Sequence, residues 1–132
     1  HRDLHLSIRR QRQMCIRDSK MCYAAYTKGS SALLLGVRAL AEQMGVSDSL
    51  ISEWAISQIG LEERSRNTAY STSQKAWRFS GEMREIAATY SAAGLPAGFH
   101  EAAAELFERM KGFKDREPAT IDELTTVILH GE

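Results

Sequence analysis

The sequence predicts an all-α fold, a bundle of about six helices with a long, buried first helix. Three observations predict it: apolar side chains recur at helical spacing, no stretch alternates apolar with polar side chains, and glycine or proline separates the helical stretches. Hydrophobic residues make up 43% and charged residues 26% of the chain, proportions that exclude a disordered protein. No apolar run reaches about 18 residues, so no membrane span is predicted.

The first 19 residues differ from the rest of the chain in charge and in pattern. They hold five Arg and two Asp, whereas residues 20–132 hold twelve Lys and Arg and fifteen Asp and Glu. A basic arm that binds nucleic acid is one interpretation of such a segment. The segment also resembles translated sequencing-adapter DNA: CAC CGA GAT CTA CAC encodes residues 1–5, CGT CGG CAG CGT CAG residues 9–13, and ATG TGT ATA AGA GAC residues 14–18. We therefore expect residues 1–19 to be a non-native, adapter-derived tail.

The first native helix is expected from about Lys20 to Met44. It is apolar on several sides, which predicts that neighbouring helices bury it. Its apolar residues are Met21, Ala24, Ala25, Leu33, Leu34, Leu35, Val37 and Leu40. The small residues 29–31 permit the close approach of another backbone or of a ligand. Gly45 is placed to end the helix as the residue after its C-cap.

A second helix is expected over about residues 48–59, with Ser47 as its N-cap and Gly60 at its end. Its inward side chains are expected to be Leu50, Ile51 and Trp54. Residues 61–72 are polar and predict at most one short helix.

Three further helices are expected in the second half of the chain. A long helix over about residues 73–93 carries Phe79, Met83, Ile86 and Tyr90 on one face. Residues 94–96, Gly-Leu-Pro, end it and start the next, over about residues 97–113. That helix is expected to bury Phe99, Ala102, Ala103, Leu106, Met110 and Phe113. Thr120 and Glu123 form a predicted capping box for a last short helix.

Residues 41–54 resemble a DNA-binding helix-turn-helix, because a small residue, a turn glycine and an apolar residue have the required spacing. The chemistry argues against this function. The second helix offers Asp48 and Glu53 but neither Lys nor Arg, and residues 20–132 carry a net negative charge. We therefore expect no nucleic-acid partner. The alternative function is a non-enzymatic helical binding module. Its most specific version is DNA binding through residues 41–54.

Several segments resemble the C-terminal helical domain of the phosphogluconate dehydrogenase-like oxidoreductases, within the β-hydroxyacid dehydrogenase superfamily. They are Lys20–Gly29, Ala32–Leu35, Arg38–Ala41, Lys75–Phe79, Gly81–Met83, Glu85–Ala87 and Ala93–His100. The resemblance covers most of residues 20–112. It implies the substrate-binding and dimerisation domain of a cytoplasmic, homodimeric oxidoreductase acting on a small hydroxy acid or a phosphorylated sugar acid. It also implies that NAD or NADP is bound by a missing N-terminal Rossmann domain, so that this chain alone is inactive.

The resemblance also implies roles for individual residues. Lys20 matches the superfamily's catalytic lysine, which transfers a proton at the substrate hydroxyl or carbonyl during hydride transfer. Many relatives have Asn where this chain has Ala24, and Tyr23 could replace that hydrogen bond. Lys28 is a candidate for binding a substrate carboxylate or phosphate. Arg84 falls where β-hydroxyacid relatives have Lys, and it is a candidate for substrate contact.

No metal site is expected. His100 is predicted to be a lone histidine on the polar side of its helix, without the surrounding ligands that a metal needs. Without its partner domain or a second subunit, the helical domain is expected to expose apolar surface and to self-associate.

Overall fold

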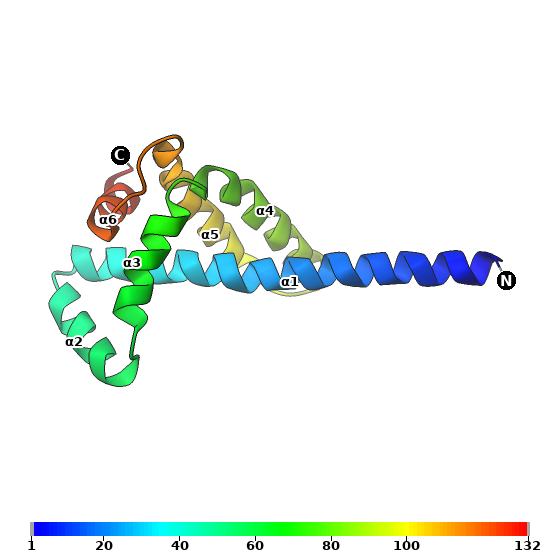
Figure 1. The fold of residues 1–132 in the computed structure, drawn as a ribbon, viewed down its shortest axis with the longest axis horizontal. Helices are drawn as coiled ribbons and strands as arrows, with labels where there is room; N and C mark the ends of the chain where they lie inside the picture. The colour runs from blue at the N-terminus through cyan, green and yellow to red at the C-terminus, as the bar shows by residue number, and fades with distance from the viewer. Residues whose placement is uncertain (1, 132) are drawn as a thin grey trace.

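The computed structural model describes residues 2–131, with side chains from Cys15 to Gly131, and this part of the chain is all-helical (Figure 1). Six α-helices and one 3-10 turn follow one another without a strand in the described residues. In order they are α1 (Arg2–Gln43), α2 (Ser47–Ser57), α3 (Leu61–Thr72), α4 (Ala76–Ala92), α5 (Gly98–Arg109), η1 (Lys111–Phe113) and α6 (Ile121–His130). The predicted all-α bundle is confirmed.

Helix α1 is the axis of the bundle, because each of the other five α-helices contacts it. Figure 1 shows its N-terminal half projecting beyond them, whereas its C-terminal half runs between α3 and the pair α4 and α5. Leu35, Ala32 and Ala39 on this second half are almost fully buried. Leu33 and Leu40 are exposed, so the prediction that they lie in the core is wrong.

The predicted start of the first helix near Lys20 is also wrong, since α1 begins at Arg2. Residues 2–28 hold neither proline nor glycine and many good helix formers, so nothing in them interrupts the helix. The side chains of residues 15–20 are exposed, so this stretch adds nothing to the core. The adapter origin of residues 1–19 stays a prediction, and within that segment His1 lies outside the described residues.

Two helices end at the glycines that the sequence indicates. Gly45, with φ +70°, follows α1, and the N–H groups of Gly45 and Val46 donate to the carbonyls of Glu42 and Ala41 at 3.1 and 2.9 Å. Gly94 ends α4 through the same pair of hydrogen bonds. This is the Schellman motif, which needs a left-handed residue that glycine adopts without strain.

Three predicted helix boundaries move. Ser47 does not cap α2: the N-cap is Val46, and the Ser47 hydroxyl donates to the Glu42 carboxylate at 2.9 Å. Helix α2 ends at Ser57, and Gly60 directly precedes α3 instead. Helix α4 begins three residues later than predicted, because Ser73 is the C-cap of α3, where its amide donates to the Ala69 carbonyl at 3.1 Å.

Helices α4 and α5 form the most extensive contact in the bundle. The predicted inward face of α4 is confirmed for Phe79, Met83 and Ile86, which are buried, while Tyr90 is half-buried. The predicted face of α5 is wrong at its start, since Phe99 is 79% exposed and Ala102 is exposed. The buried residues there are His100, Ala103, Ala104 and Phe107. Phe107 packs edge-on against Phe79, with ring centroids 5.4 Å apart.

The predicted capping box of α6 is confirmed. The Thr120 hydroxyl accepts from the Glu123 amide at 3.2 Å, and the Glu123 carboxylate accepts from the Thr120 amide at 3.3 Å. Replacing Thr120 by alanine is expected to lower the free energy of unfolding by about 1 kcal/mol, because one N-terminal amide loses its partner. Urea denaturation followed by circular dichroism measures this loss. An unchanged midpoint for the Thr120→Ala variant would contradict the prediction.

Candidate functional site

A small hollow lies between α1 and α4 at the point where α1 enters the bundle. Its volume is about 190 Å³, and its lining is Arg17, Lys20, Met21, Ala24, Glu82, Glu85 and Ile86. Met21, Ala24 and Ile86 supply its apolar part, and the charged groups come from both helices. The hollow therefore places the predicted catalytic Lys20 opposite two carboxylates.

The helical repeat explains why these residues share one hollow. Lys20 and Ala24 are one turn apart on α1, and Glu82 and Glu85 are one turn apart on α4. From the sequence, Lys20 is the catalytic candidate, Glu82 only a weaker candidate, and Glu85 has no assigned role. The spacing of Glu82 and Glu85 can be read from the sequence, but the packing of α4 against α1 cannot.

Lys28 is engaged by Glu82 beside the hollow. Its ammonium nitrogen lies 2.7 Å from both carboxylate oxygens of Glu82 and 4.6 Å from the centre of the Phe79 ring. Both charged side chains are about one-third exposed. Solvent screening keeps the contribution of such a pair to stability at or below about 1 kcal/mol. Glu82 holds the Lys28 ammonium in place, and a substrate anion would have to share it. Substrate binding by Lys28 stays a prediction.

Tyr23 and Arg84 lie away from the hollow. Tyr23 is exposed on α1 and is not among the lining residues. Arg84 is exposed on α4, and its charge is one of the weaker causes of the lowered pKa of Glu108 on α5. The pKa of Glu108 lies below its ordinary value, chiefly because Lys111 donates a hydrogen bond to its carboxylate. The structure thus brings Lys20 and Lys28 toward the α4 glutamates but does not bring Tyr23 and Arg84 to them.

A second and larger groove, of about 1050 Å³, runs between α1, the end of α4 and the start of α5. Apolar side chains form most of its wall, and His100 lies among the lining residues. Those wall residues include Met21, Tyr26, Leu33, Tyr90, Leu95, Phe99 and Leu106.

His100 is buried, so its predicted position on the polar side of α5 is wrong. The side chain is 6% exposed, and Nε2 lies 3.0 Å from the carbonyl oxygen of Ala25, to which an Nε2–H would donate. Its ring packs against Tyr90 with centroids 4.8 Å apart. The close approach of the His100 ring to α1 depends on Gly29, because a Cβ there would lie 2.9 Å from Nε2. Within the described residues, Nδ1 is a buried polar atom without a hydrogen-bond partner.

The described residues contain no group of three or more His, Cys, Asp or Glu side chains that could hold a metal ion. No helix in residues 2–131 combines the length and the apolarity that a membrane crossing requires.

A dinucleotide cofactor does not fit the described residues either. Such a cofactor is held by a glycine-rich turn between a strand and a helix. The four glycines with positive φ, Gly45, Gly60, Gly94 and Gly131, all stand at helix ends, and residues 2–131 contain no strand. A glycine-rich turn between a strand and a helix is therefore absent from residues 2–131.

The stretch from Ala41 to Trp54 does form two helices joined by a tight turn at Gly45. On α2, Asp48 and Glu53 are exposed, and the helix holds no Lys or Arg. A recognition helix needs cations for the DNA phosphates, which α2 does not offer.

The chain is accordingly expected to give no shift of random duplex DNA in a native gel at near-physiological salt. The acidic α2 would repel the phosphates, and this is the physical reason for the expected result. A salt-sensitive shift of the unmodified chain would restore the binding-module alternative.

Fold and site together define an all-helical domain whose longest helix presents a lysine to two carboxylates. The chain belongs to the DUF1932 family, described as "Domain of unknown function (DUF1932)", which matches residues 41–110, more than half of the chain. This domain is associated with the C-terminal region of 6-phosphogluconate and hydroxyacid dehydrogenase-like proteins. No match to the chain was found among curated proteins or among solved structures.

Proposed function

We propose that residues 20–132 are the C-terminal substrate-binding domain of a cytoplasmic NAD(P)-dependent oxidoreductase acting on a small hydroxy acid or a phosphorylated sugar acid. The membership of the DUF1932 family is the observation that carries the proposal, because this domain accompanies dehydrogenase-like proteins. The position of Lys20 in a hollow supports it independently. By itself the chain is expected to be inactive.

Lys20 is suited to exchange a proton with a substrate oxygen. Its ammonium stands at the end of a flexible stem beside an apolar floor of Met21 and Ile86. A second domain closing over this exposed hollow would remove water from the lysine, and desolvation favours the neutral amine of a lysine. A neutral amine can accept the hydroxyl proton, and an ammonium can return it to a carbonyl oxygen.

The acidic side of the hollow has a different role in the proposal. Glu85 lines the hollow, and Glu82 contributes while it also binds Lys28. Carboxylates accept hydrogen bonds from hydroxyl groups, so they would orient the polyhydroxyl end of a substrate. Arg17 belongs to the segment interpreted as adapter-derived, and we give it no role.

The nucleotide cofactor would supply the hydride acceptor and donor from the domain that precedes Lys20 in the parent protein. The test is therefore the natural reading frame upstream of the Lys20 codon, recovered from overlapping genomic reads. We expect a strand followed by Gly-x-Gly-x-x-Gly and then a helix. A natural start codon at this position, with no nucleotide-binding fold before it, would refute the proposal and favour the helical binding module.

A further inference from the structure

Arg38 carries a positive charge into the interior of the bundle. It lies on α1, where this helix packs against α3, and only 8% of the residue is exposed. Every other Lys, Arg, Asp and Glu between Cys15 and Gly131 is half-buried or exposed. Arginine side chains stay protonated in proteins, so the charge is permanent. Taking a charge out of water is unfavourable unless a counter-charge or hydrogen bonds compensate it.

Arg38 has one hydrogen-bond partner, and that partner is neutral. Its Nη1 donates to the Ser65 hydroxyl of α3 at 2.5 Å, and the same hydroxyl donates to the Glu62 carbonyl at 2.6 Å. Ser65 is fully buried, so it holds Nη1 in a fixed place. The ion pairs formed among residues 15–131 do not include Arg38. The charge of Arg38 is therefore not compensated by this part of the chain.

The two carboxylates that stand one helical turn away have other partners. Glu42 lies one turn after Arg38 on α1, and it accepts a hydrogen bond from a serine hydroxyl of α2 at 2.9 Å. Glu62 lies one turn before Ser65 on α3, and its two oxygens accept from Arg66 at 2.9 and 3.1 Å. Neither carboxylate is the counter-ion of Arg38.

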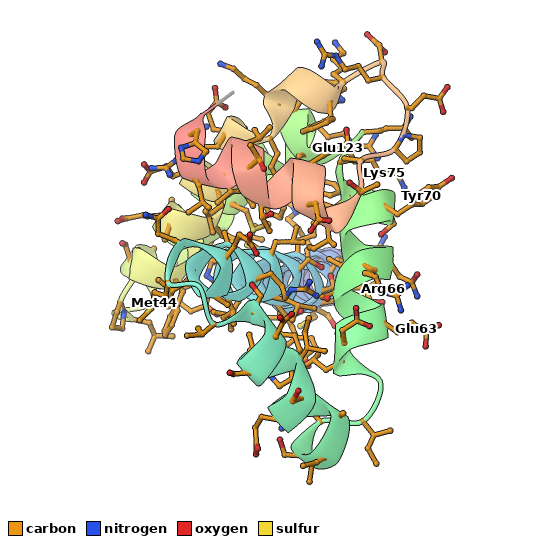
Figure 2. The ribbon with its side chains drawn as sticks, turned by 90° about the vertical axis from the view of Figure 1, so that its left-hand side faces the viewer. Met44, Glu63, Arg66, Tyr70, Lys75 and Glu123 are labelled. Carbon is orange, nitrogen blue, oxygen red and sulfur yellow. The ribbon has the colours of Figure 1, made fainter. Side chains whose placement is uncertain are left out.

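One edge of the Arg38 guanidinium keeps access to the surface. Among the described side chains, the only fully buried polar atom without a partner is Nδ1 of His100. Nε and Nη2 of Arg38 have no partner either, so they are not fully buried. The stem and Nη1 lie inside the bundle, whereas the Nε–Nη2 edge reaches its surface. Figure 2 looks along α1 and shows α3 beside it at this junction.

The open edge has the geometry of an oxyanion site. The N–H groups on one edge of a guanidinium point the same way and match the two oxygens of a carboxylate or phosphate. Hydrogen bonds of this kind would also supply the counter-charge that the bundle lacks. We propose that the Nε–Nη2 edge of Arg38 binds a small oxyanion, a molecule with a carboxylate or phosphate group. Ser65 is the positioning residue that holds the guanidinium for it.

The oxyanion site is separate from the Lys20 hollow and from the large groove. Arg38 lines neither of them. Along α1 it lies about 27 Å from Lys20 at the rise of an α-helix, so an anion bound there is a second ligand and not the substrate. The inference does not depend on the oxidoreductase role. Anion binding tests the one and genomic sequence tests the other, so their failures are distinguishable.

The first experiment is calorimetric titration of the full chain with inorganic phosphate and, separately, with acetate, at constant ionic strength. The unmodified chain is expected to bind one anion, and the tighter of the two shows which group the site prefers. Arg38→Met keeps the length of the side chain but removes its charge. Its dissociation constant should rise at least about tenfold, the loss of one charge-assisted hydrogen bond.

Arg116→Met is the matched control for Arg38→Met. Arg116 is exposed in the loop before α6 and takes no part in the ion pairs of residues 15–131. Its loss removes the same charge but should leave the affinity unchanged. Arg38→Lys keeps the charge and loses the planar edge, so it should also bind more weakly than the unmodified chain. Circular dichroism checks that each variant is folded.

The second experiment follows the arginine Nε–H signals by nuclear magnetic resonance, and it reads the site in the unmodified chain. The Arg38 signal is identified as the one that Arg38→Lys lacks. Phosphate is expected to shift this signal in a saturable way and to leave that of Arg116 in place. In Ser65→Ala the shift should become smaller while the circular dichroism spectrum is unchanged, because the guanidinium is no longer held.

Three outcomes would overturn the proposal. If neither anion binds, water alone solvates the open edge. If Arg38→Met binds as tightly as the unmodified chain, the anion lies elsewhere. If phosphate shifts the Arg116 signal as much as the Arg38 signal, the binding is a general attraction between anions and exposed cations.

Discussion

Replacing Lys20 by methionine in the intact parent protein is expected to lower kcat by about 10²- to 10⁴-fold, the usual contribution of general acid–base catalysis. The reason is the loss of the ammonium group that is proposed to exchange a proton with the substrate oxygen. The thermal midpoint should change little, because the Lys20 side chain is exposed. Nicotinamide absorbance with a panel of hydroxy acids and sugar acid phosphates measures the rate.

Lys75→Met is the matched control for Lys20→Met. Lys75 is also an exposed lysine, here at the N-cap of α4, and Figure 2 shows it beside α3 and α6, whereas the hollow lies between α1 and α4. This variant should keep the kcat of the parent. Full activity in Lys20→Met would contradict the assigned role while leaving the family membership untouched.

Replacing Gly29 by alanine is expected to lower the free energy of unfolding by about 1–3 kcal/mol, the cost of overpacking a tight contact. The new Cβ would lie 2.9 Å from Nε2 of His100, so either the imidazole or α5 must move. The same substitution in a His100→Ala background no longer meets the imidazole, whose atoms are the three nearest to the added Cβ. There it should be neutral or stabilising by up to about 1 kcal/mol, since alanine favours helix over glycine.

Urea denaturation of the four proteins of this double-mutant cycle gives the coupling between residues 29 and 100. Gly81→Ala is the control, because Gly81 also lies inside a helix but a Cβ there meets nothing within 4 Å. That variant should be stabilised. Equal effects of Gly29→Ala with and without His100 would show that the close contact does not limit the packing of α1 on α5.

The buried face of α4 and the C-terminal ends of α1 and α4 could be predicted, because the local sequence allows few alternative structures there. Phe79, Met83 and Ile86 are the large apolar residues at helical spacing on α4, and only one face can hold them. Gly45 and Gly94 stand where left-handed backbone is needed. These features depend on residues close together in the chain, so the sequence contains what determines them.

The face of α5 could not be predicted in the same way. Two stripes compete there, one through Phe99 and Ala102 and another through His100, Ala104 and Phe107, and both have helical spacing. The second stripe is buried because Gly29, seventy-one residues earlier, leaves room for an imidazole. Which of two equally spaced stripes is buried depends on the helix that packs against them. That contact between distant residues cannot be predicted from a single sequence.

The candidate site was predicted in part for a similar reason. The family resemblance identified Lys20 because the residues that carry it, Lys20–Gly29, are adjacent in the sequence. Glu85 joins it only because α4 packs along α1, and Lys28 is engaged by a glutamate from the same helix.

The arrangement in which every helix rests on α1 has a consequence for biosynthesis. The final helix, α6, packs on the first, with Leu124 and Ile128 in the same core cluster as Leu35 and Ala39. On the ribosome, that core stays open until about ninety further residues have emerged after Leu35, several seconds at ordinary elongation rates. Through that interval the nascent chain offers an apolar helix to chaperones and proteases, and synthesis speed then governs yield as much as equilibrium stability does.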